Sequence, residues 1–173
     1  MIALIYSLLV SLREGMVRLR FVFGIFFLAI AAPSADAPIV PHTVCEILHD
    51  LPGFEAAPVA VLGRYSFRED QGRWLDEQAC AGISEPPVLW LQEDLKDGPK
   101  PPGDFELDGV ALNQKFADLR KRTSLARFRF GSSDYDRWAV VYGHVAARKG
   151  DALKKAPADL IFRGDGVVIF LTP

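Results

Sequence analysis

The sequence contains few of the residues, and none of the short motifs, on which most catalytic and metal-binding sites depend. It has two cysteines, two methionines and three histidines in 173 residues. It has no P-loop, dinucleotide-binding glycine pattern, EF-hand loop, H-E-x-x-H helix or G-x-S-x-G elbow. The pattern therefore gives no support for a nucleotide-dependent enzyme, a calcium-binding protein, a zinc protease or a serine hydrolase of that type, and we expect no cofactor.

The chain also lacks an apolar run long enough to cross a membrane. A spanning helix needs about 20 apolar residues, whereas the run that begins at Phe21 ends at Ala32. Two arginines precede this run and small residues follow it, which is typical of a secretory signal peptide. We expect residues 1–31 to be a signal peptide with its true start at Met16, and the mature chain to be periplasmic or secreted without a membrane span. An uncleaved membrane anchor is the alternative.

The remaining chain has the length of one domain. About 140 residues follow the signal peptide, enough to bury a core, and we expect an extended lead-in over residues 32–42 before a single domain over residues 43–173. Residues 69–108 carry eleven acidic and three basic side chains, and residues 115–137 carry seven basic and three acidic ones. A basic segment can bind phosphate backbones, but in an exported chain of net negative charge we expect no nucleic-acid partner.

Both cysteines, Cys45 and Cys80, lie in the expected mature domain. An even number of cysteines in an exported chain indicates a disulfide, and two cysteines allow only one pairing. His42, Cys45 and His49 have a spacing that can bind zinc, yet no fourth ligand is apparent, so we expect no metal site. A redox or metal sensor built on Cys45, His49 and Cys80 remains an alternative.

Two helices are predicted. Thr43 and Glu46 form a capping box before an apolar stripe that extends to Leu51, where Pro52 ends the helix. The second helix is expected over residues 110–122. It places its leucine and phenylalanine side chains on one face.

Alternation and turn residues predict several short strands. Gly63 lies in the middle of the first and longest strand, where a barrel strand can bend. The predicted order is three strands, a helix and then further strands, which is the chain order of a small OB-like β-barrel. We expect the last two strands to pair as a hairpin. The alternative is an α+β sheet with helices on one face. The expected strands cover residues 59–67, 73–78, 88–92, 125–130, 138–145, 160–163 and 167–171.

Several short motifs along the mature chain also resemble those of a group of small exported bacterial proteins of unknown function. This resemblance implies export and a compact β domain, and it brings no catalytic residues with it. The motifs are Val44-Cys45-Glu46-Ile47-Leu48, Val59-Ala60-Val61-Leu62-Gly63-Arg64, Trp74-Leu75, Cys80 and Tyr142-Gly143-His144.

The leading functional hypothesis is an exported, non-catalytic module that binds a ligand or protein partner or has a structural role. Aromatic residues on the first three strands of an OB-like barrel lie at its usual ligand face. Beside arginines they can bind sugars, peptides or polyanions. The alternative is that both tryptophans belong to the core. The candidate binding surface consists of Arg64, Tyr65, Arg73, Trp74 and Trp90.

The second functional hypothesis is a hydrolase that uses loop carboxylates with a histidine. Asp134 and Asp136 are paired carboxylates that can act with His144 in acid–base chemistry. Turn formation also explains the two aspartates, and the histidine alternates with large apolar residues as a packed strand residue does. We therefore favour a non-enzymatic role and assign no catalytic residue.

Overall fold

The structure is a computed structural model that describes residues 37–55, 57–149, 156–164 and 168–171. Residues 38–173 form one compact unit, which contains every element named below. The expected signal peptide over residues 1–31 lies outside the described residues. Within the part of the chain that is described, no helix has the length and apolar character needed to cross a membrane.

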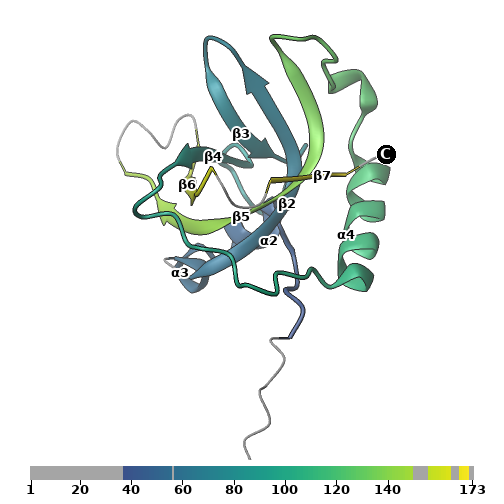
Figure 1. The fold of residues 1–173 in the computed structure, drawn as a ribbon. Helices are drawn as coiled ribbons and strands as arrows, with labels where there is room; N and C mark the ends of the chain where they lie inside the picture. Colours follow the sequence, from purple (N-terminus) through teal and green to yellow (C-terminus); the bar gives the residue numbers. More distant parts are fainter. Residues whose placement is uncertain (1–36, 56, 150–155, 165–167, 172–173) are drawn as a thin grey trace, which may run out of the picture. The chain divides into compact units, whose positions relative to one another are not determined.

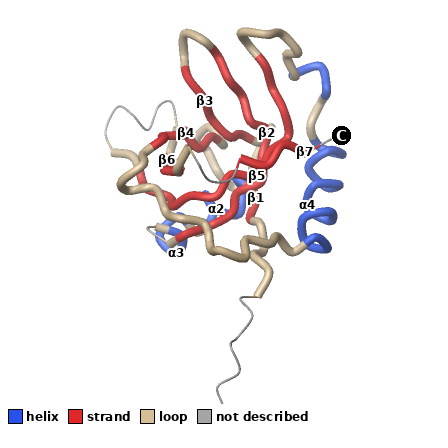
Figure 2. Tube along the Cα trace, viewed as in Figure 1, coloured by secondary structure: helices blue, strands red, loops and turns tan. Residues whose placement is uncertain are grey.

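Five strands close into a barrel (Figures 1 and 2). They are β2 (Pro58–Arg68), β3 (Gly72–Asp76), β4 (Val88–Glu93), β5 (Tyr135–Ala147) and β6 (Ala158–Phe162). Their order around the barrel is β2-β3-β4-β6-β5, and β5 pairs again with β2. Only β4 and β6 are parallel neighbours in this ring. With a helix between the third and fourth barrel strands, this confirms the predicted OB-like fold.

Two further strands extend the sheet outside the barrel ring. β1 (His42–Thr43) lies parallel to β2, and β7 (Val168–Leu171) lies antiparallel to β5. The long β2 pairs with β5 along most of its length, and its second half also pairs with β3 from Arg64 onward. The change of partner follows Gly63, where a Cβ atom would lie 3.0 Å from the Val44 side chain. The first strand therefore has partners on both sides, as its length predicted.

Helices flank the barrel, and the first and the longest of them begin at side-chain caps. α2 (Val44–His49) has the predicted capping box between Thr43 and Glu46. A separate turn, α3 (Leu51–Phe54), continues where we expected the helix to end, because proline is tolerated in the first turn of a helix. α4 (Gly109–Arg122) begins after Asp108, whose carboxylate accepts hydrogen bonds from two backbone amides of the first turn.

The apolar residues form two cores, one on each side of the β2–β5 pair. The inner core fills the barrel, and Val44 and Ile47 of α2 belong to it with no exposed surface. The outer core lies between the outside of the barrel and α4, where Leu119 and Phe116 meet Trp138. The N-terminal helix thus packs into the barrel core, and the helix between the third and fourth strands covers the outside.

Two sequence predictions about strands are wrong. Residues 125–130 form a 3-10 turn, η1 (Leu125–Arg127), and only Phe130 pairs with Tyr135 in an isolated bridge. The Ser124 hydroxyl accepts a hydrogen bond from the Ala126 amide and stabilises the turn in place of a strand.

The second error concerns the end of the chain. β6 and β7 do not pair as a hairpin, because closing the barrel requires β6 to pair with β4 on one edge and β5 on the other. β7 instead pairs with β5 along Trp138 to Val141, next to the stretch that pairs with β6.

Candidate functional site

The five residues of the predicted binding surface do not form one surface. Alternation along β2 places Arg64 on the outer face of the barrel and Tyr65 in the inner core. On β3, Trp74 lies opposite Ser66 on the outer face, and Arg73 lies on the other face. On the outer face, Trp74 and Trp90 come together as a cross-strand pair between β3 and β4, while Tyr65 and Arg73 interact with each other on the inner face.

Arg64 is engaged in a buried ion pair. Its Nε and Nη2 donate hydrogen bonds of 2.7 and 2.6 Å to the two carboxylate oxygens of Asp76, and its Nη1 donates to the Arg127 carbonyl. Burial acts to lower the pKa of the guanidinium, but the hydrogen-bonded Asp76 outweighs it and the pKa is raised. Both side chains are about nine-tenths buried, so Arg64 holds the sheet and is not available to a ligand.

Tyr65 and Arg73 belong to the inner face near one end of the barrel. Tyr65 is 4% exposed and stacks on Tyr135. Its burial and the neighbouring Tyr135 raise the pKa of the phenol, against the influence of Arg73, so the hydroxyl stays protonated at neutral pH. Arg73 lies over the Phe162 ring and forms an ion pair with Glu93.

Trp74 and Trp90 form the centre of a stacked row, here called the tryptophan ladder. Their rings are parallel within 16° with centroids 5.7 Å apart. The guanidinium of Arg68 lies 5.5 Å from the Trp74 ring centre, and that of Arg148 lies 5.4 Å from the Trp90 ring centre. Each ring therefore has an arginine partner as well as its indole neighbour.

A hollow of about 670 Å³ lies along the tryptophan ladder. It is lined by the outer face of β3 and β4, by two residues of the loop before β3 and by an arginine that follows β5. OB-folds bind ligands on the face of their second and third strands with the neighbouring loops, which here are β3 and β4. The lining residues are Asp70, Gln71, Trp74, Val88, Trp90 and Arg148.

The structure does not bring the residues of the hydrolase hypothesis together. Asp136 is 2% exposed and accepts hydrogen bonds from Arg68 and from the Arg129 amide, while Asp134 pairs with Arg129. His144 lies eight residues along β5 from Asp136, about 26 Å at the usual rise of a strand. The two aspartates thus hold Arg68 and Arg129 in place.

Cys45 and Cys80 form the predicted disulfide, with their Cα atoms 5.4 Å apart. Glu77 lies beside it, where its carboxylate accepts a hydrogen bond of 2.9 Å from the Cys45 amide in the first turn of α2. The two sulfurs and this carboxylate are close enough to share a metal ion, but sulfurs joined in a disulfide are not thiolate ligands. The bridge therefore connects α2 to the chain after β3.

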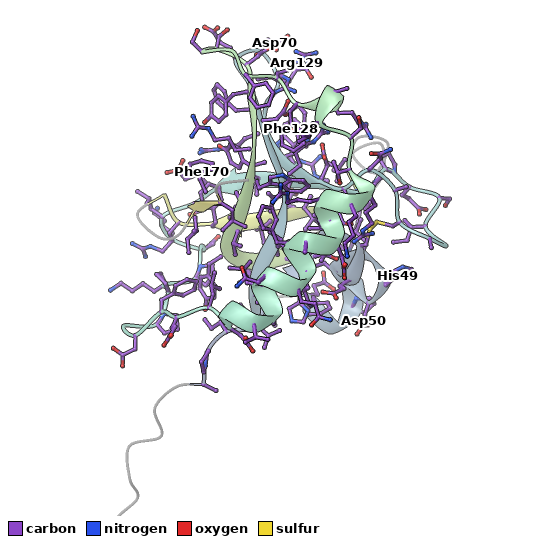
Figure 3. All side chains as sticks on the ribbon, turned by 90° about the vertical axis from the view of Figure 1, so that its right-hand side faces the viewer. His49, Asp50, Asp70, Phe128, Arg129 and Phe170 are labelled. Atoms are coloured by element: carbon purple, nitrogen blue, oxygen red, sulfur yellow. A yellow bond between two sulfur atoms is a disulfide. The ribbon has the colours of Figure 1, made fainter. Side chains whose placement is uncertain are left out.

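A second hollow contains residues that the sequence analysis did not select. It measures about 320 Å³ and lies between η1, the start of β5 and the end of β7. Figure 3 labels Phe128, Arg129 and Phe170 from its lining. The sequence does contain a sign of this hollow, since phenylalanines at 128 and 130 lie in the basic segment. Because a strand was expected there, the turn that exposes them was not predicted.

Comparison with known proteins adds no functional assignment, since no protein-family model, no curated protein and no solved structure matches this chain.

Proposed function

We propose that this protein is an exported, non-catalytic binding module whose ligand face is the hollow along the tryptophan ladder. The observation that carries the proposal is the stacked pair of Trp74 and Trp90 in a hollow on the β3–β4 face. Aromatic rings held in fixed positions give large contact areas at small entropic cost. The link between this face and ligand binding is an analogy with OB-folds in general.

The ladder limits the way in which a ligand can bind. Arg68 already lies over the Trp74 ring and Arg148 over the Trp90 ring, so a flat ligand has to displace an arginine or contact the ring edges. Asp70 and Gln71 lie in the loop before β3 and are exposed, so they can hydrogen-bond to a ligand without rearrangement of the sheet. Sugars and extended peptides, which carry many hydroxyl or amide groups, suit such a mixed rim.

The binding test uses the fluorescence of the tryptophans with a panel of neutral oligosaccharides, sulfated oligosaccharides and acidic peptides. We expect at least one class to change the emission, and Trp90→Ala to lose that response while the far-ultraviolet circular dichroism stays unchanged. Gln71→Ala, an exposed loop substitution, should weaken the same binding without affecting the fold. Phe130→Ala, at the second hollow, is the matched aromatic control and should bind as the parent does. Unchanged binding in both Trp90→Ala and Gln71→Ala would rule out this face.

The exported location has its own test. The basic residues Arg18 and Arg20 and the sequence Ala29-Ile30-Ala31 suit a signal peptide and its cleavage site, and the disulfide suits an oxidising compartment. N-terminal sequencing of protein from the native host should find a start near Ala32 or Pro33. An intact Met1 in the membrane fraction would contradict export by cleavage.

A further inference from the structure

The described surface has an unusual concentration of large apolar side chains at the second hollow. Six such residues are exposed in the part of the chain that the structure describes, and three of them line this one hollow: Leu125 (64%), Phe130 (81%) and Phe170 (44%). The other three, Val40, Leu95 and Val110, line neither described hollow. Exposed apolar residues that gather in one place mark a binding site more often than scattered ones do.

The hollow, here called the aromatic groove, is built from three segments that are distant in sequence. Its lining comes from Leu125 with residues 128–131, from residues 135–138 at the start of β5, and from residues 170–171 at the end of β7. Phe128 stacks on Phe130 at 6.2 Å and leans on Trp138 at 5.3 Å. Phe170 packs edge-on against buried Tyr65. Several of the aromatic rings are therefore fixed by neighbours while the groove between them stays open.

The groove also has positive charge that the surrounding residues do not neutralise. Arg137 is exposed and lies 5.5 Å from the ring centres of Tyr135 and Phe170. No carboxylate among the described residues forms an ion pair with it, whereas Asp136, the acidic residue in the lining, is already bonded to Arg68. Arg120 lines an adjoining hollow that shares Leu125 with the groove, and it too lacks an ion pair within the described chain.

A buried donor in the lining has no acceptor. Trp138 is 3% exposed, it lines both the groove and the adjoining hollow, and its indole N–H has no hydrogen-bond partner among the described residues. An unsatisfied buried donor destabilises a protein unless an acceptor is supplied. The indole nitrogen has no exposed surface, so it does not contact a ligand directly. The exposed Arg137, which has no carboxylate partner among the described residues, favours a ligand with a negative charge.

We propose that the aromatic groove binds a small amphiphilic anion, namely a carboxylate or sulfate carried on an aromatic or acyl body. The apolar body lies against the phenylalanines, and the charged group lies at Arg137. The volume of about 320 Å³ suits a small molecule. A guanidinium held between rings is well placed to bind an oxyanion.

The test compares two dyes that share one aromatic body. 1-Anilinonaphthalene-8-sulfonate is an anion, and N-phenyl-1-naphthylamine is the same ring system without the sulfonate. We expect the purified, cooperatively folded protein to bind one equivalent of the sulfonate dye. Arg137→Gln should lower the affinity for the sulfonate dye by about tenfold and leave the affinity for the neutral dye unchanged. Phe130→Ala should lower the affinity for both dyes.

Matched variants keep this result specific. Arg127→Gln removes an exposed arginine of the same segment that does not line the groove, and Trp90→Ala removes the ladder site of the proposed function. Both should bind the dyes as the parent does, so that the two sites are tested separately.

Three outcomes would overturn the proposal. The first is that Arg127→Gln and Arg137→Gln weaken the binding of the sulfonate dye equally. The second is that Phe130→Ala binds the sulfonate dye as the parent does. The third is that the parent binds no dye and sediments as a dimer, which Phe130→Ala breaks. The last outcome would assign the groove to a second copy of the chain.

Discussion

At the scale of single residues, the outer face of the barrel is organised by arginines that bind carboxylates. Arg64 holds Asp76 and Arg68 holds Asp136, and in both pairs the two side chains are about nine-tenths buried or more. Removing one partner of a buried pair leaves a charge without compensation, which costs far more than breaking an exposed pair. Arg64 was predicted from the sequence to belong to a binding surface, because alternation shows which face a residue occupies but not what covers that face.

Arg64→Met should therefore lower the free energy of unfolding by about 3 kcal/mol, measured by urea denaturation at neutral pH. The loss arises because Asp76 stays buried without its guanidinium partner. Arg73→Met is the control, since its pair with Glu93 is about one-third exposed or more on both sides and should cost less than about 1 kcal/mol. Similar losses in the two variants would contradict the importance of the buried pair.

At the scale of elements, local signals were sufficient where an element depends on its own residues. The capping box at Thr43 and the alternation from Val59 to Phe67 gave α2 and β2 nearly to the residue. The strand predicted at residues 125–130 was mistaken because it lacks a partner: Phe128 and Phe130 have the alternation of a strand, but only Phe130 pairs with another residue, Tyr135. The two tryptophans were selected from their place on the first three predicted strands, whereas the groove required knowledge of how β7 approaches β5.

The α2 helix is the element that depends most on a covalent connection. It has six residues, and helices of this length are marginal in isolation. Its stability comes from the burial of Val44 and Ile47 in the inner core, from Glu77 at its first turn and from the bridge to Cys80. The disulfide closes a separation of 35 residues, which includes α2, α3, β2 and β3.

Cys80→Ser should lower the free energy of unfolding by roughly 2–4 kcal/mol. Amide exchange should rise first over Thr43 to Leu51, since this segment loses its tether to the chain after β3. Thiol titration of the unfolded, unreduced parent is the direct control and should detect no free thiol. Two free thiols per chain would show that the bridge does not form, and the hypothesis of a metal site at Cys45 and His49 would then regain support.

At the scale of the whole described domain, closure of the ring is the central feature. A closed barrel has no free edge at its pairing strands, so both sides of β6 are occupied by β4 and β5. The close approach of β5 and β6 relies on Gly143, where a Cβ atom would lie 2.5 Å from the Ile161 carbonyl oxygen. A backbone atom cannot move aside as a flexible side chain can.

Gly143→Ala should therefore separate β5 from β6 and destabilise the domain by about 2 kcal/mol, with a lower midpoint in thermal unfolding. Gly103→Ala is the matched control, because an added methyl group there meets no atom within 4 Å and should have little effect. A parent-like midpoint for Gly143→Ala would mean that this strand contact adjusts more easily than its geometry indicates.

The place of β6 in the ring also sets the order in which the protein is completed during synthesis. Leu89 of β4 pairs with Ala158 of β6, so one edge of β4 stays unpaired until residues 158–162 have been made and have reached it. Pairing between such distant segments slows folding, and unpaired edges invite aggregation in the meantime. The ring of this domain therefore closes only after β6 has been made, long after β4, the strand with which it pairs in parallel.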